Sequence, residues 1–136
     1  MIIQLKILIK LLVFYWQWCL KMLDANEVFQ EELKSHLAKF EIFLKQKLKP
    51  RTIYNHAVVI SHLIDFLCWD CNVSSFLEIH RGMVCSRFRQ WYCSNTGDSE
   101  SQANASVKKF FTFLVFEQGI AIGKDVLTGL KIKVKA

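Results

Sequence analysis

Two stretches decide the fold of this chain: Lys49-Pro-Arg-Thr-Ile-Tyr-Asn-His-Ala-Val-Val-Ile-Ser-His-Leu-Ile-Asp-Phe-Leu67 (residues 49–67) and Val107-Lys-Lys-Phe-Phe-Thr-Phe-Leu114 (residues 107–114). In both, apolar residues recur every three or four positions, which is the spacing of one face of an α-helix. Basic or polar side chains stand at the start or on the flank of each block. The chain holds only one proline and five glycines, so we predict helices around these blocks as well. The predicted fold class is therefore all-α.

The length of 136 residues and the hydrophobic content of 52% suit one compact core. Outward from the two blocks, we predict a bundle of four main helices, over about 26–47, 50–69, 77–93 and from a cap at Ser99 or Ser101 to about 118. Asp24 or Asn26 is expected to cap the first helix, and residues 94–99 form a loop. Pro50 suits a first helical turn and Gly119 a helix end. The predicted core positions are Phe29, Leu33, Leu37, Phe40, Leu44 and Leu48; then Ile53, Ala57, Ile60, Leu63 or Ile64, and Leu67; then Leu77, Val84, Phe88 and Trp91; and finally Ala103, Val107, Phe110, Phe111 and Leu114.

Residues 1–23 differ from the rest, because they are strongly apolar and carry three lysines and no acid. A secretory signal is disfavoured, since Lys10 lies inside the apolar stretch and no small-residue cleavage pattern follows it. The apolar run from Leu11 to Leu20 is too short for a membrane span. Three interpretations stay open: an interfacial amphipathic helix with Lys6, Lys10 and Gln17 on its wet side, an extra helix that covers apolar surface, or a start-site artefact with translation beginning at Met22.

The formal net charge of +6 suggests a polyanionic partner. Half of it comes from residues 1–23, however, and the acidic residues that follow offset the next lysines. The remaining excess lies toward the end of the chain, beginning with Lys108 and Lys109. Charge alone makes nucleic-acid binding plausible without establishing it.

A sharper indication comes from the order of side chains in the two blocks. Thr52 is followed eight residues later by Ile60 and then by the pair Phe66-Leu67, and Lys108 precedes the run Phe110-Phe111-Thr-Phe113-Leu114. From about residue 26 to 133, the chain resembles the N-terminal core-binding (SAM-like) domain of the tyrosine recombinase, or phage integrase, family. Gly119-Ile120 and Leu130-Lys131-Ile-Lys133 resemble that domain's exit. The chain departs from the family pattern at His56, Gln102, Asn104 and Gly123-Lys124-Asp125.

The resemblance implies a core-binding domain over residues 24–123 and a basic exit over residues 124–136 toward a separate catalytic domain. Its implied partner is double-stranded DNA at a recombination site, together with other recombinase protomers on that DNA and with no small-molecule substrate. The parent protein would be a site-specific recombinase, whereas this domain would bind DNA without cutting it. Tyr15, Tyr54 and Tyr92 lack the surroundings of the family's nucleophile, so no catalytic residue is assigned.

Two groups of residues are the predicted DNA contacts. Free backbone N–H groups at the start of the second helix, with Lys49 and Arg51 beside them, suit a phosphate, and Thr52 and Asn55 would add polar contacts. In the fourth helix, Ser101, Gln102, Lys108 and Lys109 would form a face suited to the major groove. The alternative is that these are ordinary solvated side chains.

Cys68-Trp-Asp-Cys71 is a CxxC motif, but no second closely spaced cysteine pair accompanies it, so we predict no zinc site. Cys68 is instead expected in the core. Five cysteines without a secretion signal fit reduced thiols in the cytoplasm. Sequence motifs of common enzymes are absent and no cofactor is predicted. The alternative function is a helical interaction module in which Phe14, Trp16 and Trp18 dock a membrane surface or a partner groove.

Overall fold

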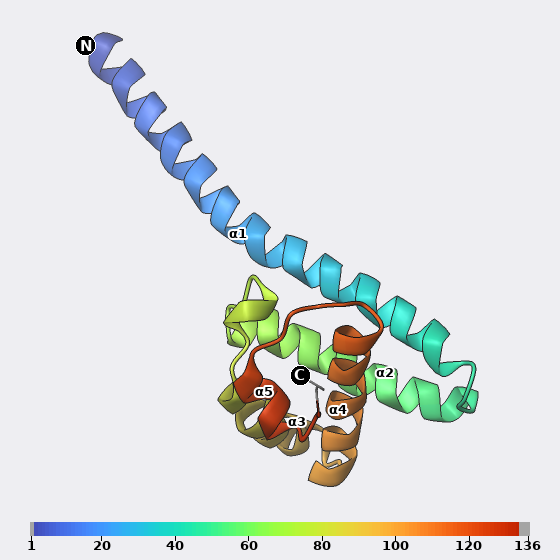
Figure 1. Cartoon of the computed structure of the whole chain (residues 1–136). Helices are drawn as coiled ribbons and strands as arrows, with labels where there is room; N and C mark the ends of the chain where they lie inside the picture. Colours follow the sequence, from blue (N-terminus) through green and yellow to red (C-terminus); the bar gives the residue numbers. More distant parts are fainter. Residues whose placement is uncertain (1, 134–136) are drawn as a thin grey trace.

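A computed structural model describes residues 2–133 of the chain, and within them the side chains of residues 4–18 and 25–133. Every regular element in this range is helical (Figure 1), which confirms the all-α prediction. The α-helices are α1 (Ile2–Leu44), α2 (Pro50–Asp65), α3 (Phe88–Thr96), α4 (Glu100–Phe116) and α5 (Lys124–Gly129). Shorter helical turns are the π-helical turns Phe66–Asp70 and Met83–Arg87 and the 3-10 turn Phe76–Glu78.

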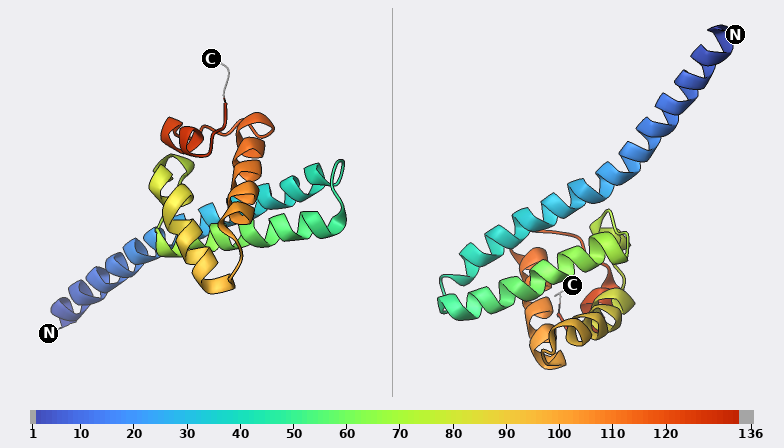
Figure 2. Two further views of the ribbon diagram at one scale, coloured as in Figure 1. Left: turned by 90° about the horizontal axis from the view of Figure 1, so that it is seen from below. Right: turned by 180° about the vertical axis from the view of Figure 1, so that it is seen from behind.

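Helix α1 is continuous from Ile2 to Leu44 and, at about 1.5 Å per residue, is roughly 65 Å long. The predicted helix start at Asp24 or Asn26 is therefore wrong: both residues lie inside the helix. No proline or glycine occurs before Pro50, so nothing in the backbone interrupts the helix where the composition changes. The N-terminal half of α1 projects away from the other helices in every view (Figures 1 and 2).

The C-terminal half of α1 packs against α2 and α4 through the predicted stripe. Phe29, Leu33, Phe40 and Leu44 are buried, and Leu37 and Leu48 are partly buried. The ring of Phe40 meets two aromatic rings of α4, with centroid distances of 5.3 Å to Phe110 and 5.4 Å to Phe113. Burial of large aromatic side chains is one of the strongest contributions to a small core, so this contact ties the two helices together.

Helix α2 begins at Pro50, as predicted, with the proline in the first turn where its missing N–H costs nothing. The predicted inward positions are all buried: Ile53, Ala57, Ile60, Leu63, Ile64 and Leu67. The π-helical turn that follows α2 carries Cys68, which is 1% exposed. The prediction that Cys68 packs in the core is confirmed.

The segment between α2 and α4 departs most from the expected helix. The prediction that Leu77 faces the core is wrong, because it is 73% exposed. A 3-10 turn replaces the expected α-helical start and turns Phe76 inward instead, with its ring 5.0 Å from that of Phe29. Downstream, α3 continues to Thr96, inside the predicted loop, and ends at Gly97 with φ of +76°. A positive φ is freely available to glycine, which explains the stop at this position.

Helix α4 starts with the predicted cap, in which the Ser99 hydroxyl accepts a hydrogen bond from the backbone N–H of Gln102 at 3.3 Å. The predicted core positions Ala103, Val107, Phe110, Phe111 and Leu114 are all buried. The helix ends at Phe116, and Gly119 follows with φ of +66°, which is the conformation expected of a glycine after a helix C-terminus.

Residues 124–132 fold back onto the domain. They include the short helix α5 and bury Val126, Leu130 and Ile132. The backbone N–H of Arg81 donates to the Asp125 carboxylate at 2.9 Å, which links this segment to the turn before α3. The burial of these apolar side chains offsets the conformational entropy that the segment loses on ordering, whereas a solvated linker would have no such compensation.

Candidate nucleic-acid interface

All eight predicted contact residues are exposed: Lys49, Arg51, Thr52, Asn55, Ser101, Gln102, Lys108 and Lys109. The first four lie at the start of α2, and the others lie on α4. They occupy these places because the opposite faces of both helices are apolar and buried. The exposure leaves each of these side chains free to meet a ligand.

One side-chain hydrogen bond joins α2 to α4 beside these groups. His56 Nδ1 lies 2.7 Å from Ser106 Oγ, and that hydroxyl donates to the carbonyl of Gln102 at 3.3 Å. Which atom donates in the contact between His56 and Ser106 depends on the tautomer of the imidazole. Thr52 precedes His56 by one helical turn and Lys109 follows Ser106 by three residues, so one predicted contact from each group lies beside the seam between the two helices.

The position of His56 between α2 and α4 also determines its protonation state. Burial, reinforced by the positive charge of Lys109, lowers the pKa of His56 from its ordinary value of 6.5. The lowered pKa favours a neutral imidazole at neutral pH, which fits its hydrogen bond to Ser106. His56 therefore holds the two helices together and adds no charge to the surface.

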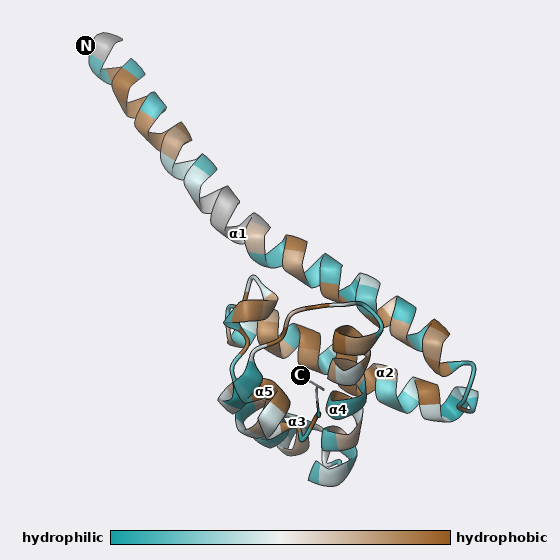
Figure 3. Cartoon of the chain, in the orientation of Figure 1, coloured by the Kyte–Doolittle hydropathy of each residue, from teal (hydrophilic) through white to brown (hydrophobic). Residues whose placement is uncertain are grey.

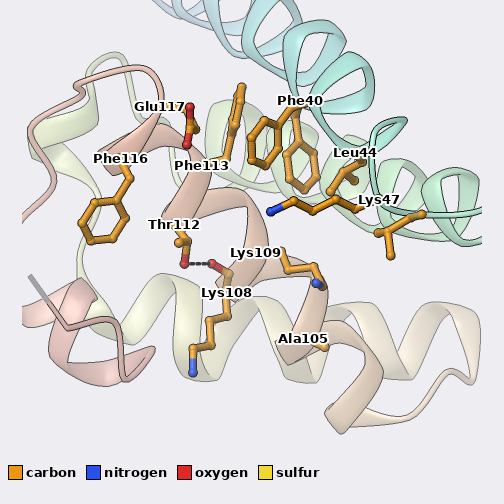
Figure 4. A pocket seen from close by; sticks show the side chains of 12 residues that line it. Phe40, Leu44, Lys47, Ala105, Lys108, Lys109, Thr112, Phe113, Phe116 and Glu117 are labelled. Carbon is orange, nitrogen blue, oxygen red and sulfur yellow. Dashed lines mark hydrogen bonds between the residues drawn. The ribbon is translucent and has the colours of Figure 1, made fainter.

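A hollow of about 500 Å³ lies between α4 and the end of α1, and we call it the α1-side hollow (Figure 4). Its apolar wall includes Phe40 and Phe113. Lys47, Lys108 and Lys109 contribute to its border, together with one carboxylate, from Glu117. The Lys47 ammonium lies 5.9 Å from the centre of the Phe43 ring, a cation–π contact that holds this lysine beside the hollow.

A second hollow of about 460 Å³, the α5-side hollow, lies on the other flank of α4. Arg89, Ser101, Asn104, Lys108 and Lys131 contribute to its lining. The guanidinium of Arg89 is 3.9 Å from the Glu100 carboxylate, and its Nε atom is buried and lacks a hydrogen-bond partner within residues 2–133. Lys108 and Ala105 belong to both hollows, so the exposed ridge of α4 separates two basic depressions.

The structure thus brings together some predicted contacts and leaves others apart. Ser101, Lys108 and Lys109 border the hollows. Lys49 and Arg51, at the start of α2, line neither hollow. Sequence reasoning missed Lys47, Arg89 and Lys131 as members of the surface. Arg89 was recognisable as an outward basic residue, but no local pattern indicates that Lys131 returns to α4, because that return depends on the packing of α5.

The surface formed by α4 and its two hollows is chemically suited to an extended anion. Five cationic side chains border the hollows: Lys47, Arg89, Lys108, Lys109 and Lys131. Opposite charges nearby are Glu117 and the Glu100 partner of Arg89. Several cations spread over one surface match a phosphate backbone better than a single anion. We call this surface the α4 basic surface.

Other reactive side chains lie elsewhere. No three His, Cys, Asp or Glu side chains gather into a possible metal site in the part of the chain that the structure describes. Tyr92 is buried and donates to Asp98 at 2.7 Å; burial, followed by the effect of Asp98, raises the pKa of Tyr92 to about 12. Burial, with Asp65 nearby, raises the pKa of Cys68 to about 11. Neither group is activated as a nucleophile.

Comparison with known proteins adds no relative: no family model, no curated protein and no solved structure matches the chain. The function is therefore inferred from the residues and their arrangement.

Proposed function

We propose that this chain is a DNA-binding domain that holds duplex DNA on the α4 basic surface. The observation that carries the proposal is the position of Lys108 on a ridge between two hollows, with four further cations around them. Lys and Arg side chains supply the phosphate contacts that dominate DNA affinity. These side chains lie on both sides of the ridge, so a duplex lying along it can contact several of them at once.

The shape of α4 supports the same proposal. Its 17 residues give a helix of roughly 25 Å, and the major groove of DNA admits one α-helix. Ala105 lies at the middle of the exposed face, where a small side chain permits close approach, and the polar Ser101 and Gln102 stand one turn before it. Phosphate contacts would come from the lysines on the flanks, and base-edge contacts from the polar residues near the start of the helix.

The particular class that we propose is the SAM-like core-binding domain of a tyrosine recombinase. Support comes from the order of Thr52, Ile60 and the Phe66-Leu67 pair in residues 49–67 and from the phenylalanine-rich end of α4. In such a protein this domain would clamp DNA at a recombination site beside other protomers, and a separate catalytic domain would perform strand exchange. Lys49 and Arg51 would then contact a phosphate at the N-terminus of α2, away from the α4 ridge.

Fluorescence anisotropy of a labelled duplex of about 30 base pairs tests the proposal. The full chain is titrated at salt concentrations from about 50 mM to about 200 mM. We expect micromolar or tighter binding at low salt that weakens steeply as salt rises. The variant K108A/K109A should bind several-fold more weakly and have a salt dependence shallower by about two counterions, because each lysine lost removes one phosphate contact.

A matched control is K34A/K39A, which removes the same charge from exposed lysines on α1, outside the α4 basic surface. Its affinity should stay close to that of the unaltered chain. Absence of binding at low salt, or equal losses in the two double variants, would remove the support for a specific surface on α4.

A further inference from the structure

Residues 4–18 present an apolar surface that no other part of the described chain covers. Every side chain in this range is exposed, including Leu8 at 60%, Phe14 at 69% and Trp16 at 67%. Figure 3 shows the hydrophobic bands along this half of α1, which extends away from the remaining helices. Large exposed apolar patches mark surfaces that bind something. The arrangement of the polar residues indicates what that is.

Lys6, Lys10 and Gln17 lie on one narrow line along the helix. At about 100° per residue they fall within roughly 40° of arc. Apolar and aromatic side chains are distributed over an arc of roughly 260° on the rest of the circumference, interrupted by Gln4. The apolar members with described side chains are Leu5, Ile7, Leu8, Ile9, Leu11, Leu12, Val13, Phe14, Tyr15, Trp16 and Trp18.

This apolar arc is wider than one partner helix can cover. A two-helix seam buries a narrow stripe, and a single partner would leave the side chains on the far flank in water. A lipid monolayer, in contrast, surrounds a helix on all sides except the one that faces the solution. With so wide an apolar arc, the helix would sit deep in the interface, and Lys6 and Lys10 would extend from their apolar stems to the headgroups.

Charge and aromatic placement favour the same occupant. The only charged side chains described in residues 4–18 are Lys6 and Lys10, and no acidic residue precedes Asp24. Positive charge without acid attracts anionic headgroups. Trp16 and Trp18 lie about 100° to either side of the lysine line, and such side chains favour the boundary between headgroups and acyl chains.

We infer that residues 4–18 form an interfacial helix that binds the surface of a membrane containing anionic lipid. Within the described residues, no helix has both the length and the apolar character required to cross a bilayer. Lys6 and Lys10 lie one turn apart on the same line, so the helix lies in the plane of the surface with that line toward water. The α4 basic surface belongs to a different part of the molecule, and the inference does not depend on DNA binding.

Flotation of the full chain with lipid vesicles tests the inference. The probes are vesicles of phosphatidylcholine alone and of phosphatidylcholine mixed with phosphatidylserine. We expect the chain to float with the mixed vesicles and much less with the neutral ones. K6A/K10A should lose the preference for phosphatidylserine, and W16A/W18A should bind the mixed vesicles at least about tenfold more weakly.

Two variants serve as matched controls. W69A removes a tryptophan that is 57% exposed but lies after α2, and K34A/K39A removes two exposed lysines further along α1. Both should float like the unaltered chain. Because the residues changed in all four variants are exposed, circular dichroism is expected to show the same helical content for each.

Three results would overturn the inference. The first is no flotation with the phosphatidylserine vesicles at low salt. The second is flotation that W16A/W18A and W69A reduce equally. The third is a concentration-dependent dimer in analytical ultracentrifugation that W16A/W18A abolishes, with no lipid binding, which would assign this surface to a second copy of the chain.

Discussion

The two halves of α1 share one helix and a high apolar content but have opposite surroundings. In residues 4–18 every side chain is exposed, whereas Phe29, Leu33, Phe40 and Leu44 in residues 25–44 are buried. Most large apolar residues of the C-terminal half lie on one stripe with charged residues opposite, although Val28 and Ile42 are exposed, so this half matches a single packed surface. The N-terminal half has its apolar residues almost all round. The distribution of apolar residues about the helix therefore separates the core half of α1 from its unpartnered half.

The largest expected difference between the halves is in how much a substitution in each changes the free energy of unfolding. Phe40→Ala should lower the free energy of unfolding by about 3–5 kcal/mol, because it empties a site where the ring is 1% exposed and touches two rings of α4. Phe14→Ala removes the same side chain from the same helix at a site that is 69% exposed. It should change the free energy by no more than about 0.5 kcal/mol.

Urea denaturation followed by circular dichroism measures both variants. Equal losses from the two substitutions would mean that the N-terminal half also packs in solution, and the contrast between the halves would be wrong.

A smaller effect is expected at the link between α2 and α4. Ser106→Ala deletes the partner of His56 Nδ1 and should lower the free energy of unfolding by about 0.5–1.5 kcal/mol, since the half-buried imidazole then loses a hydrogen bond. Ser94→Ala, at an exposed site beyond the core, is the matched control and should stay within about 0.5 kcal/mol. Denaturation midpoints in urea compare the two. An unchanged Ser106→Ala midpoint would show that this hydrogen bond does not stabilise the packed part.

The smallest expected effect is a pH dependence of the free energy of unfolding. It arises from two histidines in the packed part of the chain, which begins at residue 25. Burial is the main reason why the pKa values of both His36 and His56 lie below 6.5. For His36, the side chain of Gln118 and, to a smaller extent, the carboxylate of Glu32 at 3.9 Å raise the pKa, but they offset burial and the charge of Lys39 only in part. As the pH falls below about 6.5, the unfolded chain therefore takes up protons that the folded chain does not, and the free energy of unfolding decreases. Above that pH these two groups contribute no further change.

Denaturation midpoints at about pH 7.5 and about pH 5.5 measure this effect, and His56→Gln should reduce it. Residues 4–18 contain no histidine. A midpoint that rises toward acid would contradict the assigned sign.

Much of the fold was predictable because its signals are local. The stripes of α1, α2 and α4, the proline at the start of α2 and the Ser99 cap depend on residues a few positions apart. The errors occurred where local signals compete. Asp24 and Asn26 can cap a helix but can also lie inside one. Leu77 has the right spacing for an α-helix, but the 3-10 turn rotates Phe76 into the core in its place.

Less of the candidate site was predictable, because its parts come from separate elements. Lys108 and Lys109 stand out from the α4 sequence alone. Lys47 and Arg89 join them only through the packing of α1 and α3, and Lys131 only because α5 folds back. The hydrogen bond between His56 and Ser106 spans 50 positions, and neither residue carries a local pattern that names the other. Tertiary contacts of this kind cannot be read from helical periodicity.

The central claim is that DNA binds the α4 basic surface and the start of α2, and not the exposed half of α1. The most direct test is an NMR titration of the nitrogen-15-labelled chain with the duplex, which reports each backbone amide separately. We predict that the largest shift changes occur at residues 49–55 and 101–109, with little change at residues 4–18. The largest changes at residues 4–18, or no changes along α4, would contradict this account.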